Sequence, residues 1–73
     1  MTEQTALSDR LGKAMTRVAE AEQHISSQAA LVAELERTGQ DARRSSMILA
    51  TLRQAHDRFQ QEVDIFSRLK RGS

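Results

Sequence analysis

Two histidines, His24 and His56, are the side chains of this sequence best suited to acid–base or metal chemistry. Imidazole changes charge near neutral pH and is a common nitrogen ligand of metals. A metal site on helices needs further ligands at helical spacing, as in His-x-x-x-His or Glu-x-x-His. Neither pattern occurs, and there is no cysteine to supply a thiolate. We therefore predict no metal site and no cofactor.

Two serine pairs, Ser26-Ser27 and Ser45-Ser46, supply candidate nucleophiles. A catalytic serine needs a positioned base and a group that binds the oxyanion. No such motif accompanies either pair, and serine is ordinary on an exposed helix. We predict no catalytic residues and no enzymatic activity.

A stripe of basic residues, Arg10, Lys13 and Arg17, has the charge to meet phosphate groups or an acidic partner. Acidic residues are interspersed with it, and the chain has no Trp or Tyr on which bases would stack. The net charge of +1 adds no general attraction to nucleic acid. The pattern favours a solvated charged face, and we expect no nucleic-acid binding at physiological salt.

The composition of the chain is that of one small helical domain, with 73 residues, no Pro and no Cys. A chain this short buries a modest core and usually needs disulfides, a metal or oligomerisation. No apolar run approaches the roughly 18 residues of a membrane span. The N-terminus also lacks the basic start and apolar stretch of a signal peptide. We expect a cytoplasmic protein that does not enter membranes.

Apolar residues recur every seven positions on both sides of Gly39. The glycine suits the left-handed position beyond a helix end, and Asp41 suits the N-cap of a second helix. The a positions are Leu11, Val18, Ile25 and Val32 before the turn, and Leu52, Phe59 and Phe66 after it. We predict an all-α fold: one antiparallel, coiled-coil-like hairpin over residues 1–73, with helices at about 3–37 and 42–70 and a turn at 38–41.

When the chain folds back at this turn, two residues whose numbers add up to about 80 lie at the same height on the two helices. We call such residues level. Phe59 then lies opposite Ala21, and Phe66 opposite an alanine as well. Large side chains against small ones fill a seam without voids or clashes. The same heptad phase places Ile48 and Leu69 at d positions, inside the seam.

One flank of the predicted seam, at the e positions, is more apolar than the other. Because a four-helix bundle needs a second apolar flank on each hairpin, we expect a homodimer through this side. Glu22 and His56 lie level there as a polar break, and either a plain hydrogen bond or a pH-responsive pair fits them. The predicted self-association face consists of Met15, Glu22, Ala29, Leu49, His56 and Val63.

Apolar residues outside both the seam and this face are candidates for binding a different protein. Met47 and Ile65 are two such residues, and the basic residues Arg10, Lys13 and Arg17 are further possible partner contacts. The identity of such a partner does not follow from the sequence.

The central half of the chain contains the segments His24–Gln28, Leu31–Glu36, Gly39–Asp41 and Leu49–Leu52, followed by His56. These segments resemble a group of short uncharacterised bacterial helical proteins. The resemblance implies a bacterial origin and a hairpin shape, and it transfers no activity. The architecture is also similar to Rop, a dimer of helical hairpins that binds paired RNA loops, although no sequence motif carries that likeness. The preferred hypothesis is a self-associating protein-interaction or adaptor module, and the alternative is a Rop-like nucleic-acid-binding regulator that uses the basic open end.

Overall fold

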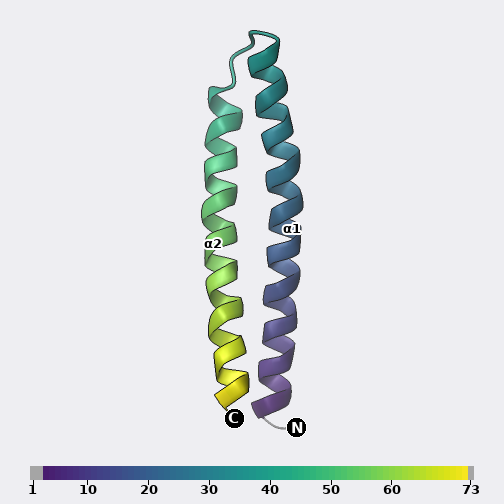
Figure 1. Cartoon of the computed structure of the whole chain (residues 1–73), viewed down its shortest axis with the longest axis vertical. Coiled ribbons are helices and arrows are strands. Elements are labelled where there is room, and N and C mark those ends of the chain that lie inside the picture. The colour runs from purple at the N-terminus through teal and green to yellow at the C-terminus, as the bar shows by residue number, and fades with distance from the viewer. Residues whose placement is uncertain (1–2, 73) are drawn as a thin grey trace.

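The chain folds into two long helices that lie side by side and run in opposite directions (Figure 1). The computed structural model describes the backbone of residues 3–72 and the side chains of residues 5–72. Helix α1 spans Glu3–Arg37 and helix α2 spans Arg43–Gly72. The molecule is 55 Å long and 14 Å across in both other directions. The predicted all-α hairpin is confirmed, with α2 beginning one residue later than expected and continuing to Gly72.

The turn follows from local rules at the C-terminus of α1. Gly39 has a φ of +74°, in the left-handed region that glycine adopts without steric cost. Its N–H donates to the Glu36 carbonyl at 3.2 Å, and the Gln40 N–H donates to the Leu35 carbonyl at 2.8 Å. These two bonds form a Schellman motif, which satisfies carbonyls that the end of a helix leaves without partners. The predicted turn at Gly39 is therefore confirmed.

Asp41 caps the start of α2, as predicted. Its Oδ1 accepts the backbone N–H of Arg43 at 3.0 Å, and its Oδ2 accepts from Nη2 of Arg43 at 2.8 Å. The side-chain hydrogen bond from Arg43, helped by the backbone one, lowers the pKa of Asp41 below its ordinary value. On the other side of the turn, Arg37 forms an ion pair with Glu34. One ion pair thus lies on each side of the turn.

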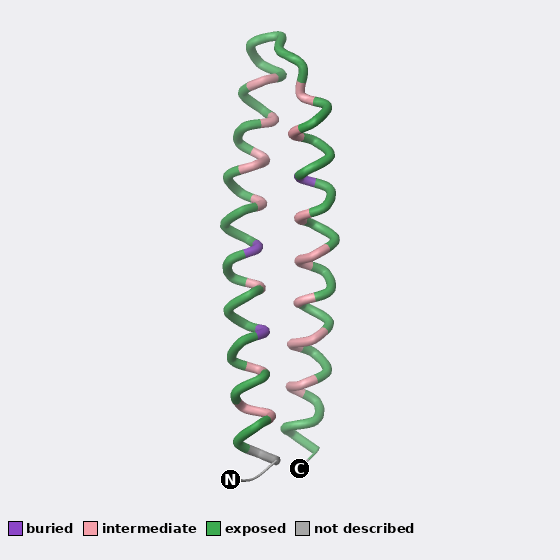
Figure 2. The backbone as a smooth tube through the Cα atoms, turned by 180° about the vertical axis from the view of Figure 1, so that it is seen from behind, coloured by how far each residue is buried: buried purple, intermediate pink, exposed green. Residues whose placement is uncertain are grey.

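The core between the helices is thin. Among the described residues, only Ala14, Ala21 and Leu49 are buried, at 1%, 6% and 8% exposure. In Figure 2 these buried positions face the opposite helix, and half-buried residues continue the seam along its length. Ala21 and Phe59 line the same hollow, which agrees with the predicted pairing of large and small side chains.

The heptad predicted for α2 is confirmed at its a positions and wrong at two of its d positions. Ile48 and Leu69, expected inside the seam, are 44% and 51% exposed, whereas Leu49, expected on a flank, is buried. The reason is that the predicted d stripe also contains Glu62, whose burial would cost free energy, while the adjoining stripe contains Val63. The observed seam of α2 consists of Ser45, Leu49, Leu52, Ala55, His56, Phe59, Glu62, Val63 and Phe66, with Glu62 at its rim.

Neither helix, within residues 3–72, carries an apolar stretch long enough to cross a membrane.

Candidate interaction surface

The hairpin has two flanks, one on each side of the seam, and the first is closed by a polar contact. Nε2 of His56 lies 3.3 Å from Oε2 of Glu22 across the helices, and Nδ1 of His56 lies 3.9 Å from Oδ1 of Asp57. The His56 side chain is only 23% exposed. We call this side the His56 flank and define it by Met15, Glu22, Ala29 and His56. The predicted levelling of Glu22 with His56 is confirmed.

The six residues predicted to form a self-association face do not form one apolar surface in the hairpin. Leu49 is buried against α1, and Ala29, His56 and Val63 are half-buried in the seam. Met15, at 56% exposure, is the one large apolar side chain left on this flank among the described residues. In the structure, Leu49, the main apolar residue of the predicted face, is therefore not on the surface. That a second copy covers this face stays a prediction.

The second flank is organised around Arg17. Its Nη1 lies 3.7 Å from Oε2 of Glu62, and its guanidinium carbon lies 6.0 Å from the centre of the Phe59 ring. An ion pair and a cation–π contact thus link α1 to α2 at one level. We call this side the Arg17 flank. Arg17 was predicted as part of a basic stripe, and here it is engaged by groups of its own chain.

Aliphatic side chains lie in the open on the Arg17 flank. Leu31, which follows Arg17 by two heptads on α1, is 45% exposed, and Ile48 on α2 is 44% exposed. Further along α2, Ile65 and Leu69 are 49% and 51% exposed, and Met47 at the edge is 71% exposed. These residues were not predicted as one surface, although the spacing of Ile48, Ile65 and Leu69 along α2 carried the signal.

Two shallow hollows lie on this flank and share Leu52. The hollow nearer the turn is bordered by Met47, Ile48 and Thr51, with Arg44 at its edge. The next one lies between the two helices and runs toward the open end. It is lined by Arg17, Glu20, Ala21, His24, Leu52, Ala55 and Phe59. A groove of this shape accepts side chains from another helix rather than enclosing a small ligand.

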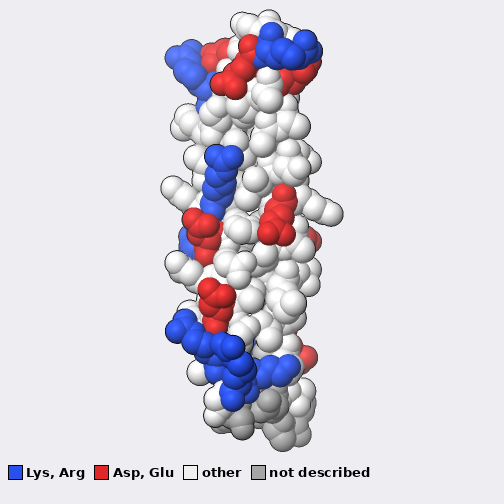
Figure 3. Space-filling view, in the orientation of Figure 1, with Lys and Arg blue, Asp and Glu red and all other residues white. Residues whose placement is uncertain are grey.

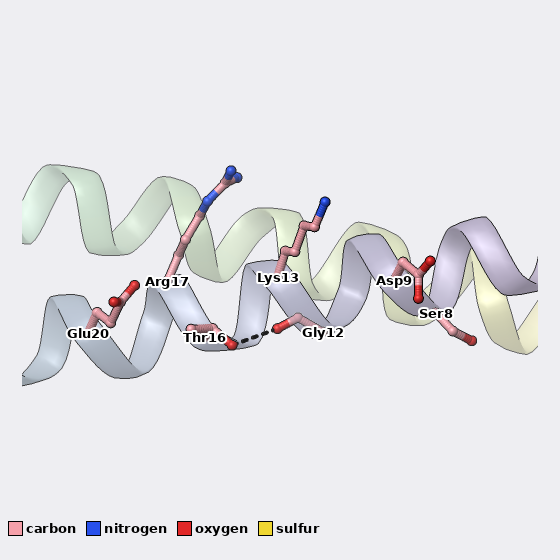
Figure 4. Close-up of a pocket in the computed structure, with 7 residues that line it drawn as sticks. All are labelled: Ser8, Asp9, Gly12, Lys13, Thr16, Arg17 and Glu20. Carbon is pink, nitrogen blue, oxygen red and sulfur yellow. Dashed lines mark hydrogen bonds between the residues drawn. The ribbon is translucent and has the colours of Figure 1, made fainter.

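The N-terminal half of α1 carries the predicted basic stripe of Arg10, Lys13 and Arg17. Figure 4 shows a dent there whose lining comes from α1 alone, with Asp9 and Glu20 beside Lys13 and Arg17. The dent lies over Gly12, whose carbonyl accepts a hydrogen bond from Oγ1 of Thr16 at 3.0 Å. In Figure 3 lysines and arginines gather toward the open end of the hairpin with acidic side chains among them. The described part of this surface carries mixed charge, which does not favour the binding of a phosphate group.

The two histidines point to opposite flanks, as predicted. His24 is exposed and borders the hollow on the Arg17 flank, whereas His56 contacts Glu22 on the other side. In the part of the chain that the structure describes, no three His, Asp or Glu side chains are grouped so that they could hold a metal ion.

Comparisons with protein-family models, with curated proteins and with solved structures find no match for this chain. The resemblance to bacterial helical proteins and the architectural likeness to Rop stay predictions.

Proposed function

We propose that this protein is a self-associating helical hairpin that serves as a protein-interaction module and performs no catalysis. The observation that carries the proposal is the row of half-exposed aliphatic side chains on the Arg17 flank, which includes Leu31, Ile48 and Ile65. The described part of the chain exposes more large apolar side chains than it buries. Exposed aliphatic side chains gathered on one face of a small domain are typical of sites that bind other proteins.

The total exposed surface supports the same proposal. It measures 5621 Å², whereas a compact monomer of 8.2 kDa exposes about 4500 Å². The excess of about 1000 Å² arises because two helices can cover only one side of each other. Association would cover the remaining apolar stripe, and chains of this size commonly gain stability in this way.

The alternative, a Rop-like nucleic-acid-binding regulator, has weaker support. Of the basic stripe, Arg17 is held by Glu62 and Phe59, whereas within the described part of the chain Arg10 and Lys13 form no ion pair or hydrogen bond with α2. Asp9 lies beside them. Strong phosphate binding needs several uncompensated cations on one face.

Sedimentation of the wild-type chain over a micromolar range tests the proposal. We expect a concentration-dependent dimer, and a species that stays monomeric throughout would contradict it. Fluorescence anisotropy with labelled RNA and DNA hairpins at low and physiological salt tests the alternative. Tight binding that weakens steeply with salt and is lost in the Arg10→Gln, Lys13→Gln double variant would replace the proposed function by the nucleic-acid one.

A further inference from the structure

We propose that a second copy of this chain docks on the Arg17 flank, with both turns at the same end. The two hairpins are related by a two-fold axis that runs parallel to their length. This inference rests on the proposed self-association and goes further, because it names the face and the arrangement. An isologous interface of this kind needs a surface that is complementary to itself.

The size of the flank suits a second hairpin. Each face of the molecule is 55 Å long and 14 Å wide, and a rectangle of these dimensions is close to the ~800 Å² that each partner contributes to a standard interface. A partner of the same length covers the whole row from Leu31 and Ile48 near the turn to Leu69 at the open end. A short peptide would leave much of that row exposed.

The register of the helices determines which residues meet across such an axis. Within the hairpin, Arg17 contacts Glu62 and Glu22 contacts His56, so residues whose numbers sum to about 80 are level. A two-fold axis parallel to the hairpin lays α1 of one copy over α2 of the other at the same level. Leu31 then faces the partner's Ile48, and the two aliphatic pairs near the turn cover each other.

The charges on the flank fit the same arrangement. Arg17 faces the partner's Glu62 while Glu62 faces the partner's Arg17, so each ion gains a second opposite charge. Glu20, which borders the hollow, is level with the partner's Arg58. At the open end, the methylene stem of Arg10 covers the partner's Leu69 while its guanidinium stays in water. Complementary charge of this kind fixes register and suppresses wrong pairings.

The reversed arrangement, with the turns at opposite ends, fits less well. It lays α1 over the α1 and α2 over the α2 of the other copy. With the ends of α1 aligned, Leu31 lies level with the partner's Asp9, and with the ends of α2 aligned, Ile48 lies within one helical turn of the partner's Ile65. The aliphatic cluster near the turn is then divided. The arrangement with both turns together is therefore the one that the flank favours.

Disulfide cross-linking tests the face and the arrangement together, because the natural chain has no cysteine. A Leu31→Cys chain is mixed with an Ile48→Cys chain that carries a mass label, and the mixture is oxidised. We expect covalent dimers that contain one chain of each kind. An Ala50→Cys chain in place of the Ile48→Cys chain is the control, because Ala50 is exposed outside both hollows. Efficient cross-linking of Ile48→Cys with Ile65→Cys instead would overturn the arrangement.

Sedimentation of Ile48→Glu separates this inference from the proposed function. Ile48 is already half exposed, so the charge should leave the hairpin folded, which circular dichroism of the monomer checks. We expect the dimer dissociation constant to rise at least about tenfold, with Ala50→Glu unchanged. A dimer that keeps its wild-type affinity in Ile48→Glu and cross-links through Met15→Cys would overturn the face alone. If the wild-type chain is monomeric, the proposed self-association is wrong, and with it the proposed function.

Discussion

The two flanks of the hairpin differ in what covers them, although each combines one face of α1 with one of α2. On the His56 flank, Leu49 turns into the seam and the contact between Glu22 and His56 bridges the helices. On the Arg17 flank, Leu31 and Ile48 stay half exposed. The seam between two helices therefore buries only one of two adjoining apolar stripes, and the other stripe stays on the surface.

Helix α2 shows how this choice arises. Its residues Leu52, Phe59 and Phe66 belong to two overlapping heptads. The first heptad also contains Ile48 and Glu62. The second heptad contains Leu49, His56 and Val63 instead. Turning α2 toward the second heptad leaves the Glu62 carboxylate 40% exposed, where Arg17 pairs with it. Avoiding the burial of a charge thus places Ile48 outside.

The largest difference between the flanks should appear when each of two neighbouring residues on α2 is replaced by glutamate. Leu49→Glu puts a carboxylate into the seam and removes a buried leucine, which should cost about 3–5 kcal/mol and abolish most helicity. Ile48→Glu should keep the helicity of the monomer, since the side chain points outward. Thermal unfolding followed by circular dichroism at low concentration measures both. Equal loss of helicity in the two variants would mean that the flanks do not differ.

A second substitution measures how tightly side chains pack in the seam beneath the Arg17 flank. Ala21 is 6% exposed and shares a hollow with Phe59. Ala21→Leu should overpack this layer and destabilise the hairpin by about 1–3 kcal/mol. Ala19→Leu is the matched control, because Ala19 is exposed two residues away and should change stability by less than about 0.5 kcal/mol. Stabilisation by Ala21→Leu would show that the layer has unfilled space.

The parts of this fold that sequence reasoning predicted correctly are governed by local rules. Gly39 has the one backbone conformation that favours glycine, and Asp41 accepts the N–H that an N-cap accepts. The spacing of apolar residues on α1 also set its seam correctly, because only one apolar stripe runs along it. In each case a residue and its immediate neighbours decide the outcome.

The orientation of α2 could not be predicted in the same way. The two heptads that share Leu52 differ mainly in whether Ile48 or Leu49 enters the seam, and hydrophobicity alone does not separate these residues. The deciding contact, Arg17 with Glu62, joins residues far apart in the chain. The position of the candidate surface depends on the orientation of α2. The predicted self-association face therefore lies on the His56 flank, which the hairpin largely closes.

The ion pair on the Arg17 flank should contribute a smaller amount to the stability of the monomer. The side chains of Arg17 and Glu62 are 53% and 40% exposed, so solvent screening limits their coupling to about 0.2–1 kcal/mol. A double-mutant cycle with Arg17→Gln and Glu62→Gln measures this coupling by thermal unfolding, and added salt should weaken it. Arg17→Lys keeps the charge but loses the planar contact with Phe59, so it should recover only part of the coupling. A coupling that is indifferent to salt would contradict an electrostatic origin.

The smallest effect concerns the turn, which serves both flanks equally and should not distinguish them. The hydrogen bonds from Arg43 hold the pKa of Asp41 below its ordinary 3.8. A carboxyl whose pKa is lower in the folded state stabilises the hairpin fully above the ordinary value, and this contribution is lost as pH falls through the lowered one. Melting temperatures measured from about pH 5 to about pH 2 should therefore fall more for the wild type than for Asp41→Asn, which keeps the cap but has no titrating group. The same difference should appear with Ile48→Glu as background, because the turn is common to monomer and dimer. Parallel acid profiles for the wild type and Asp41→Asn would show that the Arg43 contact does not stabilise the folded hairpin.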